Sequence, residues 1–192
     1  MKHLLAAALV VSGGAAQAGG PVVVADDPAV EAPAAMAADF DWTGLYVGLS
    51  VANGSFSDGF TDFDTSGYGL QAGYLRDFGK WVVGGELSYS TGDYGDLAPD
   101  SDWDATRLKV IGGYGAGRLM PYAFVGATNY NVNQSTPYSD TMANYGIGAR
   151  YAFGASGKFV AGLEYMVEKK NGFDDNFDLD NRELALRLDY RF

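Results

Sequence analysis

The feature that most constrains the fold is an alternation of apolar and polar side chains that begins at Trp42 and recurs to the last residue, Phe192. A period of two predicts β-strands, because successive side chains of a strand point to opposite faces, whereas a helix repeats every 3.6 residues. The last segment is the clearest, with Leu184, Leu186, Leu188, Tyr190 and Phe192 alternating with Glu183, Ala185, Arg187, Asp189 and Arg191. The pattern therefore predicts an all-β fold.

Eight such segments occur, and the connections between them alternate in length. The segments lie near residues 45–52, 67–76, 81–90, 103–115, 120–130, 144–153, 159–168 and 183–192. Short turns are expected at 76–80, 115–118 and 154–158, and long polar connections at 53–66, 91–102, 131–141 and 169–182. Short periplasmic turns and long external loops are typical of barrels in bacterial outer membranes. We predict an eight-stranded antiparallel transmembrane β-barrel.

The charged residues indicate which face of each strand meets lipid. One face carries apolar and aromatic residues, and the other carries Gly, Ser and most of the mid-strand charges. An Arg or Lys that faced the bilayer midplane would cost about 2–4 kcal/mol, so we place the polar face inside. A soluble lipocalin-type barrel would have the opposite arrangement. The fifth segment is the least regular, and there we expect Tyr122, Phe124 and Tyr130 to face outward although Val125 breaks the pattern.

The interior of an eight-stranded barrel is narrow and is filled by side chains, so we expect a network of charges inside it. Its members are Glu86, Arg107, Lys109, Arg150, Glu164, Arg187 and Asp189. The expected neighbours are Glu86 with Arg107 and Lys109, and Arg150 with Glu164 and Arg187. Two roles are open: a packing device that satisfies the charges, which we favour, and a gate in a narrow channel.

The N-terminus has the pattern of a secretory signal. Lys2 precedes a short apolar stretch, and residues 16–18 read Ala-Gln-Ala, which is a cleavage site of the small-x-small type. We expect residues 1–18 to be a cleaved signal peptide, the alternative being a buried N-terminal helix. Residues 19–40, rich in Ala, Pro and Val, are expected to form a flexible periplasmic segment before a barrel at 41–192.

The composition argues against several classes of function. The chain has no Cys and a single His, His3, which lies in the predicted signal peptide. A nucleophile activated by imidazole or a thiolate is then absent, so we expect no enzyme and no cofactor. The formal net charge of −11 also opposes nucleic-acid binding, which needs basic residues against phosphate.

The expected external loops are rich in aspartate. Asp174, Asp175, Asp178 and Asp180 in the last connection offer oxygen ligands for Ca²⁺ or Mg²⁺. Their spacing is not that of a calcium loop. We favour the alternative, in which they keep a solvated acidic surface.

Three stretches resemble a known group of proteins. These are residues 41–48 (DWTGLYVG), residues 121–126 (PYAFVG) and residues 188–192 (LDYRF). The chain resembles the OmpA-like and OmpX-like small barrels, and more closely the porin-family surface antigens of alphaproteobacteria. The resemblance implies that the final strand, with Tyr190 and Phe192, is the signal that the outer-membrane assembly machinery reads.

We therefore expect an integral protein of the Gram-negative outer membrane with a structural and surface-interaction role. The role would comprise membrane integrity and the display of acidic external loops. The expected partners are outer-membrane lipid and lipopolysaccharide, periplasmic chaperones, the assembly machinery, and an external ligand or host surface. The alternative is a narrow, low-conductance channel for ions or small solutes.

Overall fold

A computed structural model of the chain describes residues 40–57, 62–94, 102–133, 138–173 and 177–192. The strands are β1 (Gly44–Ser57), β2 (Asp62–Asp77), β3 (Trp81–Tyr94), β4 (Asp102–Tyr114), β5 (Leu119–Asn133), β6 (Tyr138–Phe153), β7 (Phe159–Phe173) and β8 (Phe177–Arg191). Residues 1–39 lie outside the described part, so the signal peptide and the periplasmic segment stay predictions. No helix in the described ranges is long and apolar enough to cross a membrane.

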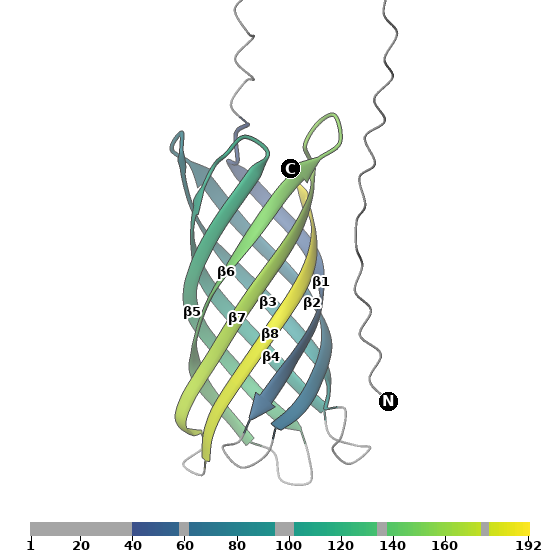
Figure 1. Cartoon of the computed structure of the whole chain (residues 1–192), viewed down its shortest axis with the longest axis vertical. Helices are drawn as coiled ribbons and strands as arrows, with labels where there is room; N and C mark the ends of the chain where they lie inside the picture. Colours follow the sequence, from purple (N-terminus) through teal and green to yellow (C-terminus); the bar gives the residue numbers. More distant parts are fainter. Residues whose placement is uncertain (1–39, 58–61, 95–101, 134–137, 174–176) are drawn as a thin grey trace, which may run out of the picture. The chain divides into compact units, whose positions relative to one another are not determined.

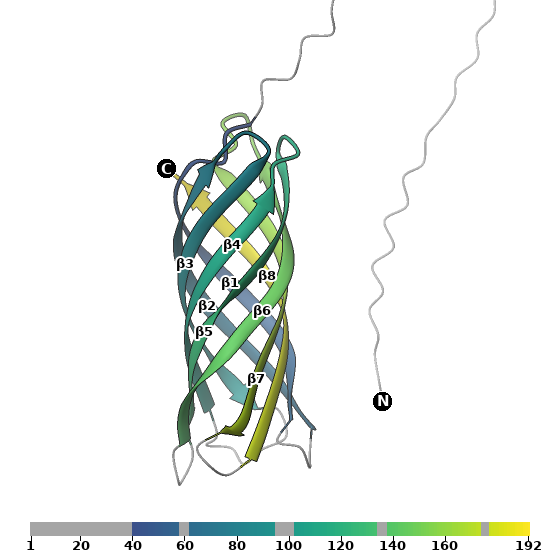
Figure 2. The same cartoon turned by 90° about the vertical axis from the view of Figure 1, so that its left-hand side faces the viewer.

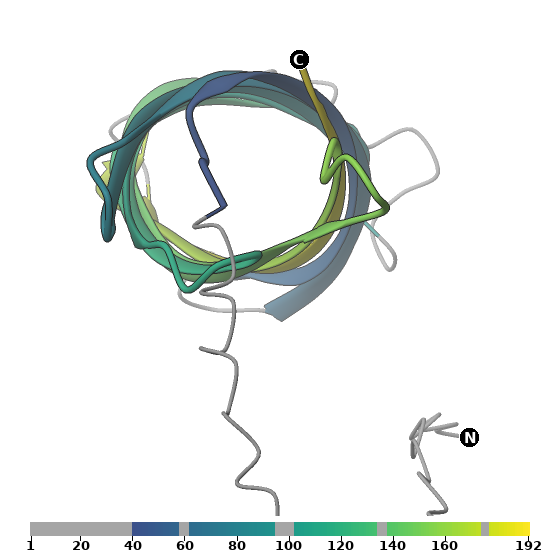
Figure 3. The same ribbon diagram turned by 90° about the horizontal axis from the view of Figure 1, so that it is seen from above.

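The strands pair antiparallel in sequence order, and β1 also pairs with β8, which closes the barrel (Figure 1). Leu49 of β1, for example, lies between Leu70 of β2 and Leu188 of β8. The predicted eight-stranded antiparallel barrel is thereby confirmed. Seen from above, the closed ring of strands is evident (Figure 3).

The three short turns lie together at one end of the barrel, near the C-terminus (Figure 1). They connect β2 to β3, β4 to β5 and β6 to β7. Gly117 and Gly157 have φ angles of 61° and 64°, a conformation in which a side chain would be strained. We call this the turn end, and the opposite end the loop end.

The strands extend farther toward the loop end than the sequence predicts. Residues 53–57 and 62–66 were expected in a long loop but belong to β1 and β2, and the other three connections are shortened in the same way. The outward face turns polar here, from Val51 to Asn53 on β1. A strand in water needs no apolar outer face, so polarity there was not a sign of a loop. Figure 2 shows the strands continuing as long, tilted ribbons.

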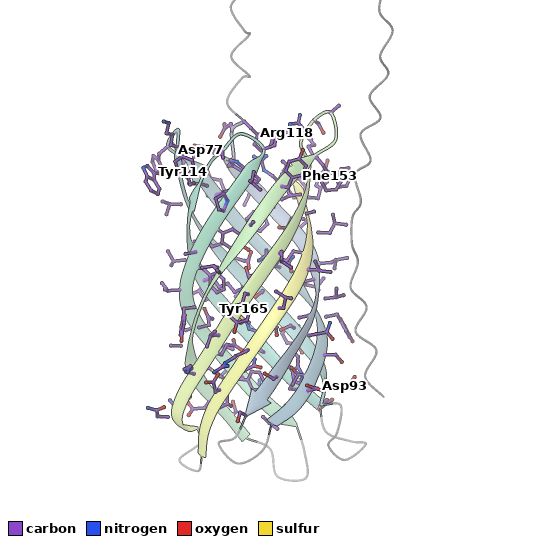
Figure 4. The ribbon with its side chains drawn as sticks, viewed as in Figure 1. Asp77, Asp93, Tyr114, Arg118, Phe153 and Tyr165 are labelled. Atoms are coloured by element: carbon purple, nitrogen blue, oxygen red, sulfur yellow. The ribbon has the colours of Figure 1, made fainter. Side chains whose placement is uncertain are left out.

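The lipid-facing band covers the part of the barrel nearest the turns. Exposed apolar residues fill it, and aromatic side chains mark its two edges. On β3 the band runs from Trp81 to Tyr89, which matches the roughly 9–11 tilted residues that cross a bilayer. Figure 4 places Tyr114 and Phe153 at the turn end, Tyr165 near the middle and Asp93 toward the loop end. The strands therefore project beyond the membrane on the loop side.

The prediction for β5 is wrong. Tyr122, Phe124 and Tyr130 are 5%, 3% and 1% exposed and point into the barrel, whereas Val125 is 62% exposed on the outside. The error arose because the interior beside β5 is itself apolar, so hydrophobicity did not distinguish the two faces.

Candidate functional site

The interior of the barrel near the turn end is a hydrophobic core. Its members are Trp42, Tyr46, Leu75, Val82, Ile111, Met120, Tyr122, Phe124, Ala152, Val160 and Met166, with Phe40 packed against them. The sequence had predicted a polar interior throughout. The inward apolar residues were missed because they are interspersed with glycines and charges along each strand. Apolar side chains thus occupy the space between the membrane-embedded strands on this side.

Residues 40–43, which we call the cork, precede β1 and reach from the rim toward the middle of the opening at the turn end (Figure 3). Trp42 is fully buried, and its Nε1 donates a hydrogen bond to the Gly117 carbonyl at 3.0 Å. Its backbone N–H donates to Asp77 Oδ2, also at 3.0 Å. Trp42 is therefore tied to two of the three turns.

Phe40 and Arg191 complete the cork. The Phe40 ring stands edge-on to Trp42 with centroids 5.0 Å apart, and a side chain at Gly157 in the third turn would collide with it. Arg191 of β8 lies 4.8 Å from the Phe40 centroid and donates to the Asp41 carbonyl at 2.7 Å. The cork therefore also fastens the last strand to the segment before the first.

Asp41 is held at the edge of the cork by Thr43. Its Oδ1 accepts the Thr43 backbone N–H at 2.7 Å. Hydrogen bonds from the Thr43 side chain and backbone hold the pKa of Asp41 below its usual value. The carboxylate is therefore ionised at neutral pH and accepts the hydrogen bond from the Thr43 backbone N–H.

The central cluster lies in the middle of the barrel and comprises Glu86, Lys109, Arg150, Glu164, Arg187 and Asp189. Arg150 Nη2 lies 2.9 Å from Glu86 Oε2, and Arg187 also pairs with this carboxylate. Lys109 Nζ lies 2.5 Å from Glu164 Oε1 and 3.5 Å from Glu86 Oε1. All six side chains are buried, and their three cations match their three carboxylates. The structure thus brings six of the seven predicted residues together.

Two tyrosines and a glutamine hold the carboxylates of the central cluster in place. The hydroxyls of Tyr46 and Tyr122 donate to Glu86 and Glu164, each at 2.7 Å. Gln71 Nε2 donates to Asp189 at 2.8 Å. These partners were not predicted from the sequence, although Tyr46 and Gln71 occupy positions whose side chains alternate toward the interior of their strands.

Arg107 does not join the central cluster, contrary to prediction. It pairs with Glu168 at 2.8 Å and Glu183 at 3.4 Å, in what we call the outer cluster. Glu86 is opposite Lys109 in the strand register, so Arg107 lies two residues nearer the loop end. In a narrow barrel its long side chain spans the lumen to β7 and β8. Arg150 likewise contacts Glu86 rather than Glu164.

Two polar side chains that were not predicted from the sequence support the outer cluster. Thr128 Oγ1 and Asn181 Nδ2 donate to Glu168 at 2.5 Å and 2.7 Å. Between the two clusters lies a chamber of about 20 Å³, bordered by Ser90, Trp103 and Glu183 among others. A water molecule needs roughly 10–15 Å³, so this chamber holds about one. The interior is packed, not open.

Tyr190 and Phe192 lie on the outer, lipid-facing side of the barrel, where β8 pairs with β7 and β1. The ring of Tyr190 is 5.4 Å from those of Phe159 and Phe192, edge-on to both. Phe192 is 70% exposed, and its backbone N–H donates to Leu45 at 3.1 Å. Its side chain is accessible from outside the barrel.

The aspartates proposed as metal ligands are only partly described. Asp180 lies on β8, whereas Asp174 and Asp175 and the side chain of Asp178 lie outside the described residues. Within the described part of the chain, no group of three or more His, Asp or Glu is placed to hold a metal ion. The metal site therefore stays a prediction.

The outer wall of the barrel at the loop end carries charge unevenly. Asp64, Asp93 and Asp102 on β2, β3 and β4 are exposed, and Asp93 is directly opposite Asp102 in the strand register. Figure 4 shows Asp93 beyond the level of Tyr165. Lys169 and Arg182, on β7 and β8, are exposed on another part of the same wall. Asp64 and Arg182 are both opposite Ser55 of β1 in the strand register, so the acidic side chains begin two strands from this pair, which itself contacts Asp180.

A family model, described as an outer membrane protein beta-barrel domain, matches residues 28–192. No curated protein sequence matches the chain significantly. Neisserial surface protein A aligns with 16% identity and a TM-score of 0.58, covering 78% of this chain and 98% of that one. Ail, the attachment invasion locus protein of Yersinia pestis, aligns with 20% identity and a TM-score of 0.58, covering 80% and 99%. The outer membrane enzyme PagL aligns with 12% identity and a TM-score of 0.50, covering 76% and 99%. At these identities the likeness shows a shared fold.

Proposed function

The chain belongs to the family of outer membrane β-barrel proteins, and from that premise we propose that it acts as a closed membrane anchor that presents an external surface. The observation that carries the proposal is the filled interior. The hydrophobic core, the central cluster and the outer cluster follow one another along the barrel, and the cork covers the turn end. A barrel packed in this way is suited to stability and display.

The external part of the strands supports a role in surface contact. β1 to β8 continue past the lipid band, and their outward residues there are polar. The exposed carboxylates of Asp64, Asp93 and Asp102 favour a basic partner, such as a host surface or a cationic ligand. We further propose that the lipid-facing band contacts outer-membrane lipid and lipopolysaccharide and contributes to membrane integrity.

Export and assembly complete the proposal. The signal peptide would be removed after Ala18, and periplasmic chaperones would deliver the chain to the assembly machinery. Tyr190 and Phe192 are the proposed assembly signal, and the exposure of the Phe192 side chain favours its recognition. No cofactor is needed for any of these steps.

The channel alternative is disfavoured by the same packing. A conducting path would have to pass the cork, the apolar core and two buried charge clusters, and the chamber between the clusters has a volume of about 20 Å³. Catalysis is also disfavoured, since His3 is the single histidine of the chain and cysteine is absent. The chain shares its fold with the enzyme PagL, but a shared fold does not indicate that this chain has a catalytic nucleophile.

The display role is tested by complementing a deletion strain with the wild-type protein or with the triple variant Asp64→Asn, Asp93→Asn, Asp102→Asn. We expect both to restore survival in detergent, because the membrane-embedded part is unchanged. We expect only the wild type to restore adhesion of cells to glass coated with polylysine, by a factor of about three or more. Equal adhesion of the two complemented strains would contradict the role of the acidic face.

A further inference from the structure

A groove of about 630 Å³ runs across the lipid-facing wall of the barrel. Two rows of outward side chains border it, and each row follows the strand register from one strand to the next. The row nearer the turn end is Phe159, Tyr190, Val47, Ala72 and Leu87. The other row runs from Leu188 on β8 to Thr106 on β4. Ligand sites commonly have volumes of about 300–1,000 Å³, so the groove has room for one chain of a lipid.

Ala72 gives the groove its depth. Its two neighbours in the row, Val47 and Leu87, are larger and stand exposed on either side of it. Gln71 and Asp189 also line the groove, but their side chains are buried in the barrel, so only their backbone forms the floor. A larger side chain at position 72 would therefore fill the middle of the groove.

The groove runs obliquely into the lipid-facing band from the turn end. Tyr190 is one residue from the end of β8, Val47 lies three residues inside β1, and Ala72 lies five residues inside β2. Phe153, which Figure 4 places at the turn end, stacks on Phe159 with ring centroids 5.9 Å apart. Ala72 is two strand spacings, or about 10 Å, from Tyr190. One leaflet of the hydrocarbon core is about 15 Å thick, so a chain that enters at the turn end reaches Ala72.

An exposed lysine stands where the groove opens at the turn end. Lys158 lies in the turn before β7, and its Nζ is 5.7 Å from the ring centroid of Tyr190, which lines the groove. Among the described residues, Lys158 has no carboxylate partner. Its carbonyl accepts the backbone N–H of Arg191, which is itself a cation, and Phe192 at the C-terminus bonds to Leu45 of β1 on the other side of β8. A positive charge therefore marks this end of the groove.

The other end of the groove has the opposite charge. Tyr89 and Thr106 border it there, and Asp93 and Asp102 lie four residues farther along β3 and β4 toward the loop end. Both aspartates are exposed and are opposite each other in the strand register. Beyond Tyr89 and Thr106 these two strands have no Lys or Arg. An anionic headgroup is therefore attracted to the turn end of the groove and repelled at its loop end.

We infer that the groove binds an acyl chain of an anionic glycerophospholipid from the periplasmic leaflet, whose phosphate pairs with Lys158. A lysine ammonium forms charge-assisted hydrogen bonds with phosphate oxygens, and the chain packs over Ala72. The bound chain crosses the pairing of β8 with β1, which closes the barrel. The inference rests on the proposed membrane anchor with a periplasmic turn end, and names one lipid and one place for its contact with lipid. It does not depend on the aspartates proposed for display.

The test measures lipid binding by the protein purified from outer membranes in detergent and stripped of lipid. The probes are phosphatidylglycerol and a diacylglycerol with the same two chains, which lacks the phosphate. Lys158→Gln removes the charge, and its control is Lys80→Gln, at an exposed lysine in another turn. Ala72→Leu fills the groove, and its control is Ala123→Leu, at an exposed alanine of β5. Native mass spectrometry gives the dissociation constants, and heat-modifiable mobility in gels verifies folding of each variant.

We expect Lys158→Gln to raise the dissociation constant for phosphatidylglycerol about fivefold and to leave that for diacylglycerol unchanged, because only the first probe has a phosphate. Ala72→Leu should raise both constants about fivefold, since both probes have the chain. The two controls should match the wild type within about a factor of two.

Several results would overturn the inference. These are equal losses in a variant and its control, a loss of both probes in Lys158→Gln, or a folded wild type that binds neither probe. Wild-type dimers that retain no phospholipid and dissociate in Ala72→Leu would instead place a second copy of the chain in the groove. If Ala72→Leu does not fold, the two lysine variants decide the question. Each of these results leaves the display role to the adhesion test.

Discussion

At the scale of single residues, the two interior clusters differ in their balance of charge. The central cluster has three cations and three carboxylates, whereas the outer cluster has Arg107 with both Glu168 and Glu183. Removing a carboxylate from the first leaves a buried cation unmatched. Removing Glu183 from the second leaves Arg107 with a partner. The same chemical change should therefore have different consequences in the two places.

We predict that Glu86→Gln lowers the free energy of unfolding by about 3–5 kcal/mol, because it deprives Arg150, Arg187 and Lys109 of a shared partner in a dry interior. Glu183→Gln should cost less than about 1 kcal/mol. Urea titration of the protein in lipid vesicles measures both. Similar losses in the two variants would show that charge balance does not govern interior stability.

A second prediction at this scale concerns the contribution of Trp42 in the cork to the stability of the barrel. Trp42→Ala should cost about 3–5 kcal/mol, because a fully buried indole is removed from the turn end. Trp42→Phe keeps most of the apolar contact and loses the hydrogen bond to the Gly117 carbonyl, so it should cost about 1–2 kcal/mol. The same urea titration distinguishes the variants. If Trp42→Ala unfolds at the wild-type midpoint, the cork is not a structural part of the barrel.

At the scale of strands, alternation in the sequence predicted the existence of all eight and the facing of all but one. It failed for β5, where Tyr122 and Phe124 fill the core and Val125 meets lipid. At that level of the barrel both the lipid outside and the interior are apolar. The alternation of side chains therefore does not indicate which residues face outward. The ends of the strands were also mislocated, since polar outward residues such as Asn53 are compatible with a strand in water.

The facing of β5 can be tested through a glycine on its neighbour β6. A Cβ at Gly148 would lie 2.5 Å from Tyr122 Cζ and 2.8 Å from the Leu163 carbonyl oxygen, whereas one at Gly112 on the lipid face of β4 meets nothing within 4 Å. We predict that Gly148→Ala costs about 1–3 kcal/mol and that Gly112→Ala changes stability by less than about 0.5 kcal/mol. If Tyr122 pointed outward, only the contact with the Leu163 carbonyl oxygen would remain, and adding Tyr122→Ala would not relieve the cost of Gly148→Ala in the urea titration.

Hydrogen exchange tests the extension of the strands beyond the lipid. Asn53, Gly54 and Ser55 pair with Ser66, Thr65 and Asp64 in the β1–β2 register. We expect amides in these stretches to exchange slowly, on the scale of hours, because ladder hydrogen bonds protect them. The exposed turn residues Ala155 and Ser156 provide a fast-exchanging reference. If the amides of residues 53–55 exchanged as fast as those of that turn, these residues would belong to a long loop, as the sequence predicted, and not to a strand.

At the scale of the whole molecule, the described barrel divides into a membrane-embedded part with a packed interior and an external part with polar walls. The sequence predicted the membrane class from the cost of placing charges in lipid. It did not predict the cork, because the alternation that begins at Trp42 does not indicate that Phe40 and Trp42 turn into the barrel before the first strand. It predicted the pair of Glu86 with Lys109 on adjacent strands, but not pairs such as Arg150 with Glu86 or Arg107 with Glu168, which join side chains across the lumen.

We propose that the barrel is closed and that its function therefore resides on its surface. The most direct test is single-channel recording of the wild-type protein and of Glu86→Ala in a planar bilayer, with β-rich circular dichroism verifying that both are folded. We expect no steady conductance from either protein, because the cork and the apolar core still block the lumen when the central cluster is weakened. Steady openings in the wild type, or openings that appear in Glu86→Ala, would contradict it and make transport the leading function.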